Sequence, residues 1–212
     1  MEQKPLGFYN YTVVLTYIGM LTGFLGISCV MSGRVETAMV CLMIAGVCDM
    51  FDGAIASTRK RTMDEKCFGI QIDSLSDLIC FGVLPALMVE KINDGQEIAF
   101  AIASLYVLSA LIRLAYFNVD EQKRQQSSSE GREWYEGLPV TTVAVILPLV
   151  WMITAGAEVI QGRVASTLTL MIVAVLFLTP FKLRKPKITG KVFMGLCGLI
   201  EFVVLIMGMG DI

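Results

Sequence analysis

The sequence predicts an all-α polytopic membrane protein, and three observations support this fold class. Hydrophobic residues make up 55% of the 212 residues, and the mean hydropathy is +0.68. Several apolar runs approach the roughly 20 residues that span a bilayer as a helix. Gly and Pro interrupt these runs, as membrane helices permit where neighbouring helices satisfy the backbone. We therefore expect a single membrane-embedded domain over residues 1–212, whose first apolar run is a retained helix rather than a cleaved signal.

Seven segments have the length and the scarcity of charge expected of membrane helices. They cover approximately residues 11–31, 35–57, 67–91, 97–118, 138–158, 164–181 and 190–210. The second and third segments are apolar except for four aspartates. The Gly137-Leu138-Pro139 turn is expected to begin the fifth helix, and the polar stretch 119–137 is expected to form the longest loop.

The distribution of Lys and Arg predicts the orientation of the chain. Basic residues gather in the N-terminus and in the loops at 58–66, 119–137 and 182–191. The opposite side holds only Arg34, Lys91 and Arg163. Cytoplasmic loops carry the excess of Lys and Arg, so we expect the N-terminus and the 58–66 loop in the cytoplasm. Seven spans then place the C-terminus outside. No nucleic-acid motif or internal repeat is evident.

Four aspartates stand out in the apolar chain. Asp49 and Asp52 are three residues apart near the end of the second segment, and Asp73 and Asp77 are four apart in the third. Residues at these spacings share one face of a helix. A loop of roughly nine residues would join the two segments as an antiparallel hairpin and bring both pairs to a similar depth. Ionised groups in a membrane cost a few kcal/mol or more and are rarely kept without a function.

Clustered carboxylate oxygens indicate a site for hard cations such as Mg²⁺, Mn²⁺ or Ca²⁺. Two divalent ions would balance four negative charges, and paired ions recur in displacement at phosphorus. The sequence contains no histidine, which excludes a histidine base, a histidine metal ligand and a Ser-His-Asp triad. Two other interpretations remain open at this point: individual aspartates that cap helices or pair with Arg59 or Arg61, and an ion-coupled transporter, which also keeps intramembrane carboxylates.

The order D-x-x-D-G-x-x-A, followed by G-x-x-x-D-x-x-x-D, resembles the signature of the CDP-alcohol phosphotransferase family. The matching positions are Asp49, Asp52, Gly53, Ala56, Gly69, Asp73 and Asp77. The chain departs from the family pattern at Ser57, where the family usually has Arg, and in an interval from Ala56 to Gly69 that is three residues longer than usual. Arg59 or Arg61 is a candidate to replace the missing arginine.

Three further blocks resemble the phosphatidylserine synthase branch of this family. They are IDSLSDLICFGVLPA at 72–86, RLAYFN at 113–118 and EGLPVT at 136–141. The resemblance covers about residues 10–185 and implies a six-helix membrane core, with an added C-terminal helix at about 190–210. It also implies a homodimer in a cell membrane, expected to be prokaryotic, with an active site open to the cytoplasm.

The resemblance implies transfer of a phosphatidyl group from CDP-diacylglycerol to L-serine with release of CMP. It assigns Asp49, Asp52 and Asp73 as ligands of Mg²⁺ or Mn²⁺, expected as two ions, and Asp77 as a ligand or general base. The binding site for the nucleotide-lipid would be lined by Gly53, Ala56, Ser57, Arg59, Arg61 and Gly69. Another acceptor, such as glycerol 3-phosphate or an inositol phosphate, is the alternative within the same chemistry.

Two polar residues of the fourth segment are candidates for binding serine. Arg113 lies within an apolar run, where a lone charge is costly, so we expect it to face a polar cavity. It would clamp the serine carboxylate or a phosphate, or else pair with a carboxylate for structure. Asn118 would orient the acceptor or cap its helix.

Overall fold

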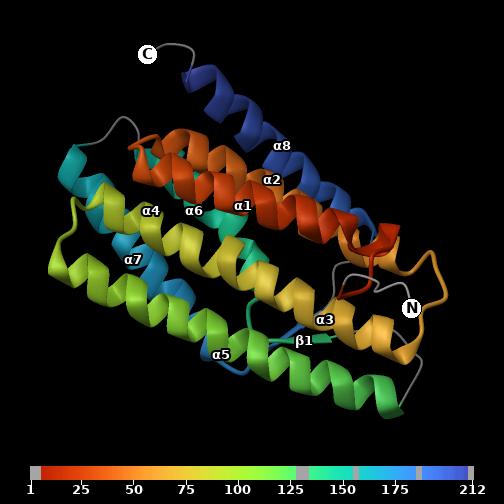
Figure 1. The fold of residues 1–212 in the computed structure, drawn as a ribbon. Coiled ribbons are helices and arrows are strands. Elements are labelled where there is room, and N and C mark those ends of the chain that lie inside the picture. Colours follow the sequence, from red (N-terminus) through yellow and green to blue (C-terminus); the bar gives the residue numbers. More distant parts are fainter. Residues whose placement is uncertain (1–5, 128–133, 155–157, 185–187, 210–212) are drawn as a thin grey trace.

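The structure, a computed structural model, describes residues 6–127, 134–154, 158–184 and 188–209. Its helices run side by side as a membrane bundle (Figure 1). The first half contains η1 (Tyr11–Val13), α1 (Val14–Met31), α2 (Val35–Ala56), α3 (Met63–Asp77), η2 (Leu78–Val83), α4 (Leu84–Ile92) and α5 (Glu97–Ser127). The second half contains β1 (Trp134–Glu136), η3 (Val140–Thr142), α6 (Val143–Thr154), α7 (Val159–Leu178), β2 (Lys182–Arg184) and α8 (Ile188–Met209).

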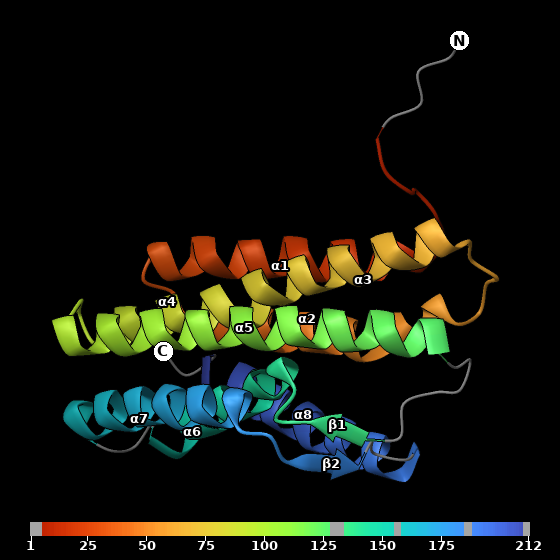
Figure 2. The same cartoon turned by 90° about the horizontal axis from the view of Figure 1, so that it is seen from below.

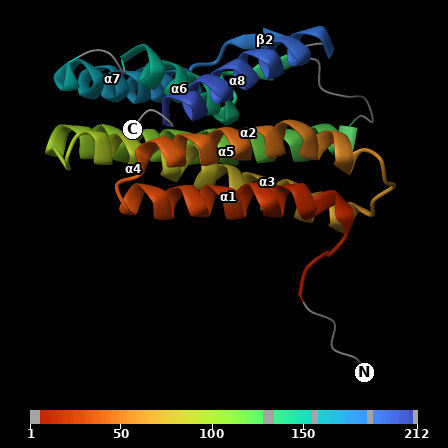
Figure 3. The ribbon, with the colours of Figure 1, turned by 90° about the horizontal axis from the view of Figure 1, so that it is seen from above.

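The all-α membrane fold is confirmed. Five helical stretches are long and apolar enough to cross a membrane: Tyr11–Met31, Val35–Ala56, Met63–Ile92, Glu97–Arg124 and Val159–Leu178. Two shorter apolar helices, Val140–Thr154 and Gly198–Met207, coincide with the fifth and seventh predicted segments. Seen from below and from above, α6, α7 and α8 form a layer on one side of α2 and α5, and α1 lies on the other side (Figures 2 and 3).

The boundaries of three predicted segments were wrong, and the sixth begins at Val159 rather than at 164. The third begins at Met63 rather than at 67, because Thr62 and Glu65 form a capping box in which each side chain bonds the other's backbone N–H. The α2–α3 connection is therefore shorter than predicted, covering residues 57–62. The fourth segment continues to Ser127 instead of ending near residue 118. Asn118 thus lies inside α5, and its interpretation as a helix cap was wrong.

Helices α3 and α4 form one continuous stretch interrupted by a π-helical turn, η2. The turn begins directly after Asp77, and such turns often occur at functional sites. The Tyr106 hydroxyl donates to the Phe81 carbonyl at 2.5 Å within this turn. Tyr106 is fully buried, so this bond ties α5 to η2 in the core of the bundle.

The first helix packs closely against η2 because small residues face the contact. A Cβ added at Gly23 would lie 2.4 Å from the Cys80 Sγ and 3.3 Å from the Cys80 Cα. Small residues permit such close approach of membrane helices. The Cys80 thiol donates to the Gly19 carbonyl, and the Ser76 hydroxyl lies 3.5 Å from the Thr16 carbonyl. These contacts fix α1 beside the helix that carries Asp73 and Asp77.

One end of the bundle carries the only sheet found among the described residues. The three-residue strands β1 and β2 pair antiparallel, with Tyr135 opposite Leu183. They lie at the same end of the bundle as the α2–α3 loop and the end of α5 (Figures 1 and 2). The Gly137 N–H donates to the Phe181 carbonyl at 2.7 Å, which extends the pairing toward the start of η3.

Candidate metal and phosphoryl-transfer site

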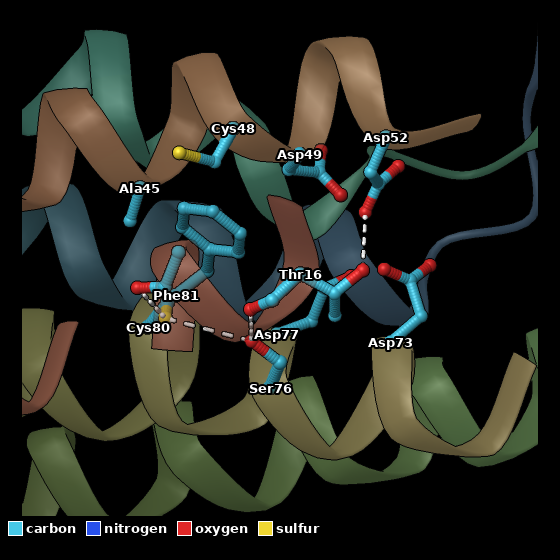
Figure 4. A pocket seen from close by; sticks show the side chains of 11 residues that line it. Thr16, Ala45, Cys48, Asp49, Asp52, Asp73, Ser76, Asp77, Cys80 and Phe81 are labelled. Carbon is cyan, nitrogen blue, oxygen red and sulfur yellow. Dashed lines mark hydrogen bonds between the residues drawn. The ribbon is translucent and has the colours of Figure 1, made fainter. Parts of the chain in front are cut away.

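The four aspartates line one pocket between α1, α2 and α3 (Figure 4). Asp49 and Asp52 approach from α2, while Asp73 and Asp77 approach from α3. Ligand oxygens of Asp49, Asp52 and Asp73 all lie within 4.8 Å of one another. Asp77 lines the same pocket but stands outside this group of three. The structure thus brings together the two carboxylate pairs of the sequence pattern.

The donor set fits a hard divalent cation. The three clustered groups offer carboxylate oxygens alone, the ligand type that Mg²⁺ and Mn²⁺ favour. Asp52 is buried, with 9% of its surface exposed. A cluster of buried like charges is unfavourable unless a cation or proton compensates it. The arrangement therefore suits metal binding and, with it, stabilisation of negative charge on a phosphoryl group.

Hydroxyl side chains lie beside the aspartates, and one of them bonds Asp52. The Thr16 hydroxyl of α1 donates to the Asp52 Oδ2 at 3.2 Å (Figure 4). Thr16 and Ser76 are both buried and both line the pocket. On the other side of the site, Thr141 of η3 lies beside Asp49. The Thr16 bond limits the rotation of the Asp52 carboxylate, which preorganises the site for its ligand.

Thr16, Ser76 and Thr141 were not among the site residues predicted from the sequence. One weak signal was available, because Ser76 lies three residues after Asp73 and therefore shares its helix face. Thr16 and Thr141 reach the aspartates from distant parts of the chain. Only the packing of α1 and the start of η3 against α2 and α3 brings them close.

The candidate residues of the α2–α3 loop differ in their surroundings. A Cβ added at Gly53 would meet nothing within 4 Å, so this side of α2 is open to a ligand. The Ser57 hydroxyl donates to the Ala54 carbonyl at 2.6 Å and thereby caps α2. Arg59 pairs with Glu65 at 3.3 Å, whereas Arg61 lies over Gly69.

The two candidates for serine binding make structural contacts. The Arg113 Nε donates to the Leu138 carbonyl at 3.3 Å, and Arg113 is buried with 6% exposed. The Asn118 Oδ1 accepts a bond from the Ser74 hydroxyl at 2.7 Å. Of the residues that the structure describes, the pocket lining includes neither of them. Arg113 and Asn118 therefore position the 137–138 turn and α3 around the pocket.

Comparison with known proteins matches residues 9–181 to the family described as CDP-alcohol phosphatidyltransferase. A CDP-diacylglycerol–serine O-phosphatidyltransferase of Saccharomyces cerevisiae is 35% identical over 66% of this chain and 54% of its own length. An archaetidylserine synthase of Methanothermobacter thermautotrophicus is 30% identical over 69% of this chain and 59% of its own. A CDP-diacylglycerol–serine O-phosphatidyltransferase of Helicobacter pylori is 27% identical over 83% and 70%.

The chain thus spans 54% and 59% of the length of the first two relatives. The family match covers the six apolar helices from α1 to α7, with α3 and α4 counted as one, and leaves α8 outside. It includes the carboxylate cluster and the pocket around it. Because the match extends over most of the sequence, the chain belongs to the CDP-alcohol phosphatidyltransferase family.

Proposed function

We propose that the protein is a phosphatidylserine synthase, which transfers a phosphatidyl group from CDP-diacylglycerol to L-serine and releases CMP. The observation that carries this proposal is the group of three carboxylates within 4.8 Å, set inside membrane helices next to a fourth. The names of the yeast and Helicobacter relatives support serine as the acceptor.

In the proposed reaction the serine hydroxyl oxygen attacks the phosphorus that carries the diacylglycerol. The bond from that phosphorus to the CMP oxygen breaks, and the serine hydroxyl proton passes to Asp77. Asp49, Asp52 and Asp73 would hold one or two Mg²⁺ or Mn²⁺ ions. A bound ion supplies Lewis-acid stabilisation of negative charge on the phosphoryl oxygens and the leaving group.

Asp77 is the proposed general base because it lines the pocket without belonging to the group of three. A carboxylate is a weak base toward an alcohol, so the rest of the site must lower the barrier. The pocket is bordered by apolar or buried groups such as Ala45, Cys48 and Phe81. These side chains exclude water and strengthen the electrostatic interactions within the site.

The nucleotide-lipid is proposed to bind along the open side of α2 and the start of α3, against Gly53, Ala56, Ser57, Arg59, Arg61 and Gly69. Serine is proposed to bind between α3 and α5, near Arg113 and Asn118. These residues bond the Leu138 carbonyl and the Ser74 hydroxyl, respectively. The Ser57 hydroxyl already caps α2, so its role would be to leave room rather than to bind phosphate.

We also propose that the site and the N-terminus face the cytoplasm, in a prokaryotic cell membrane, and that the protein forms a homodimer. The apolar helices support an integral membrane protein. The orientation is supported by the Lys and Arg of the N-terminus and of the loops at 58–66, 119–137 and 182–191.

The proposal is tested by measuring CMP release from CDP-diacylglycerol with a panel of alcohols that includes L-serine, glycerol 3-phosphate and inositol phosphate. We expect release with serine, and expect Asp77→Asn to abolish it while CDP-diacylglycerol still binds. Release with a different alcohol alone would correct the acceptor. Ion-driven uptake into vesicles without any CMP release would instead indicate a transporter.

A further inference from the structure

The loop between α2 and α3 carries three consecutive basic residues, Arg59, Lys60 and Arg61. The structure gives their side chains different surroundings. Lys60 is exposed. The Arg59 Nη2 lies 3.3 Å from the Glu65 Oε1, with 40% of the arginine side chain exposed. Arg61 is half-buried, and among the described residues it makes no ion pair or hydrogen bond. Three cations of one loop therefore have three different surroundings.

Glu65 accounts for the difference between the two arginines. Its Oε2 accepts the Thr62 backbone N–H at 2.9 Å, which closes the capping box of α3. Its Oε1 accepts from the Asn10 side chain and from Arg59, both at 3.3 Å. Only 13% of the Glu65 side chain is exposed. This carboxylate accepts three hydrogen bonds, from the residue 10 segment and from the α2–α3 loop, and so fixes Arg59 in place; none of the three comes from Arg61.

Arg61 instead lies across the start of α3. Its Nη1 is 3.1 Å from the point where a Cβ on Gly69 would stand. A Cβ at residue 69 would crowd the guanidinium, which packs closely here against a glycine. Gly69 precedes Asp73 by one helical turn, so the two share a face of α3. A guanidinium that pairs with no carboxylate in the described part of the chain therefore lies one turn away from the carboxylate cluster.

We infer that the two arginines have different roles because only Arg59 pairs with Glu65. Arg59 is a positioning residue of the loop, and Arg61 binds the diphosphate of the nucleotide-lipid. This inference rests on the proposed function. A diphosphate that reaches the cluster needs a cation beside it in addition to any metal ion, because carboxylates repel it. The planar guanidinium suits phosphate oxygens, which it binds through two parallel hydrogen bonds.

The inference is tested by binding of CDP-diacylglycerol in detergent micelles to Arg61→Gln, Arg59→Gln and Lys60→Gln, in the presence of Mg²⁺. Each variant removes one positive charge from the same loop. We expect Arg61→Gln to raise the Kd by about 10- to 100-fold, the loss of one charge-assisted contact, without a change in Tm. Arg59→Gln is expected to lower the Tm and to raise the Kd less than Arg61→Gln does. Lys60→Gln is expected to change neither, and Arg61→Lys to restore part of the affinity.

Equal increases in Kd for Arg59→Gln and Arg61→Gln would overturn the division of roles. An unchanged Kd for Arg61→Gln, together with tighter Mn²⁺ binding, would show that Arg61 only offsets the charge of the aspartates, and would also overturn it. The binding measurement needs no serine. A protein that binds CDP-diacylglycerol through Arg61 but transfers nothing to serine would therefore refute the proposed function and leave this inference standing.

Discussion

Replacing Asp73 by Asn is expected to stabilise the metal-free protein and to remove its stabilisation by metal. The ligand oxygens of Asp49, Asp52 and Asp73 lie within 4.8 Å of one another. Two unit charges at this distance repel by about 3.5 kcal/mol at an effective dielectric constant of about 20. Asp73 takes part in two of the three pairs, so at this dielectric constant its charge accounts for at least about 7 kcal/mol of repulsion before screening.

Water and monovalent cations in the metal-free site screen most of this repulsion, and we expect about 2 kcal/mol to remain measurable. For a chain of this size that corresponds to a rise in Tm of about 4–8 °C. In the wild type, Mg²⁺ at about 100 times its Kd should add about 2.7 kcal/mol of stability, and Asp73→Asn should lose most of this gain.

The assay is thermal unfolding of the purified protein in detergent, in EDTA and in a series of Mg²⁺ and Mn²⁺ concentrations. Asp64→Asn is the matched control, because it makes the same chemical change on an exposed position of the same helix. We expect this control to keep the metal response. If Asp73→Asn unfolds at a lower temperature than the wild type in EDTA, or still gains stability from Mg²⁺, the reasoning from a repulsive metal-binding cluster is refuted.

Three other predictions concern the surroundings of the site. Thr16→Val removes the bond to Asp52 and should lower the kcat for CMP release by about tenfold, whereas Thr16→Ser should keep most of it; equal rates in both variants would contradict this role. Gly23→Ala places a methyl 2.4 Å from the Cys80 Sγ and should cost about 1–3 kcal/mol in unfolding experiments, while Gly198→Ala, which meets nothing within 4 Å, should cost much less. Arg113→Lys keeps the charge but loses the Nε bond to Leu138; we expect a rise in the KM for serine with little change for CDP-diacylglycerol, and an unchanged KM would remove Arg113 from the serine site.

The helices could be predicted from the sequence because their determinants are local. Length and hydropathy located every apolar segment. The errors lie at helix ends, where a specific contact can determine the residue at which the helix begins. The early start of α3 follows from the Thr62–Glu65 capping box. Helix α5 continues nine residues beyond Asn118, to Ser127, through a polar stretch that hydropathy does not mark as part of a membrane helix. The sheet was not predictable. Each strand has only three residues, and β1 forms only by pairing with β2, far along the chain.

The site could be predicted only in part for a related reason. The aspartates are conspicuous because charge is rare in apolar segments. The hydroxyl groups beside them are not, because a hydroxyl in a helix usually bonds the carbonyl one turn earlier. Thr22 and Ser104 do this, bonding Ile18 and Phe100 respectively. Thr16 differs from them only in what α1 packs against, and the local sequence does not record that.

The position of Asp52 along α2 determines which half of a bilayer the site can serve. Asp52 lies four residues before the helix ends at Ala56, a rise of about 6 Å in a helix about 33 Å long. A lipid whose head group reaches this depth has its acyl chains in the leaflet on that side. Under the proposed function, CDP-diacylglycerol would therefore be taken from one leaflet and the new lipid would be left in it. The opposite leaflet would then receive this lipid only by its movement across the membrane.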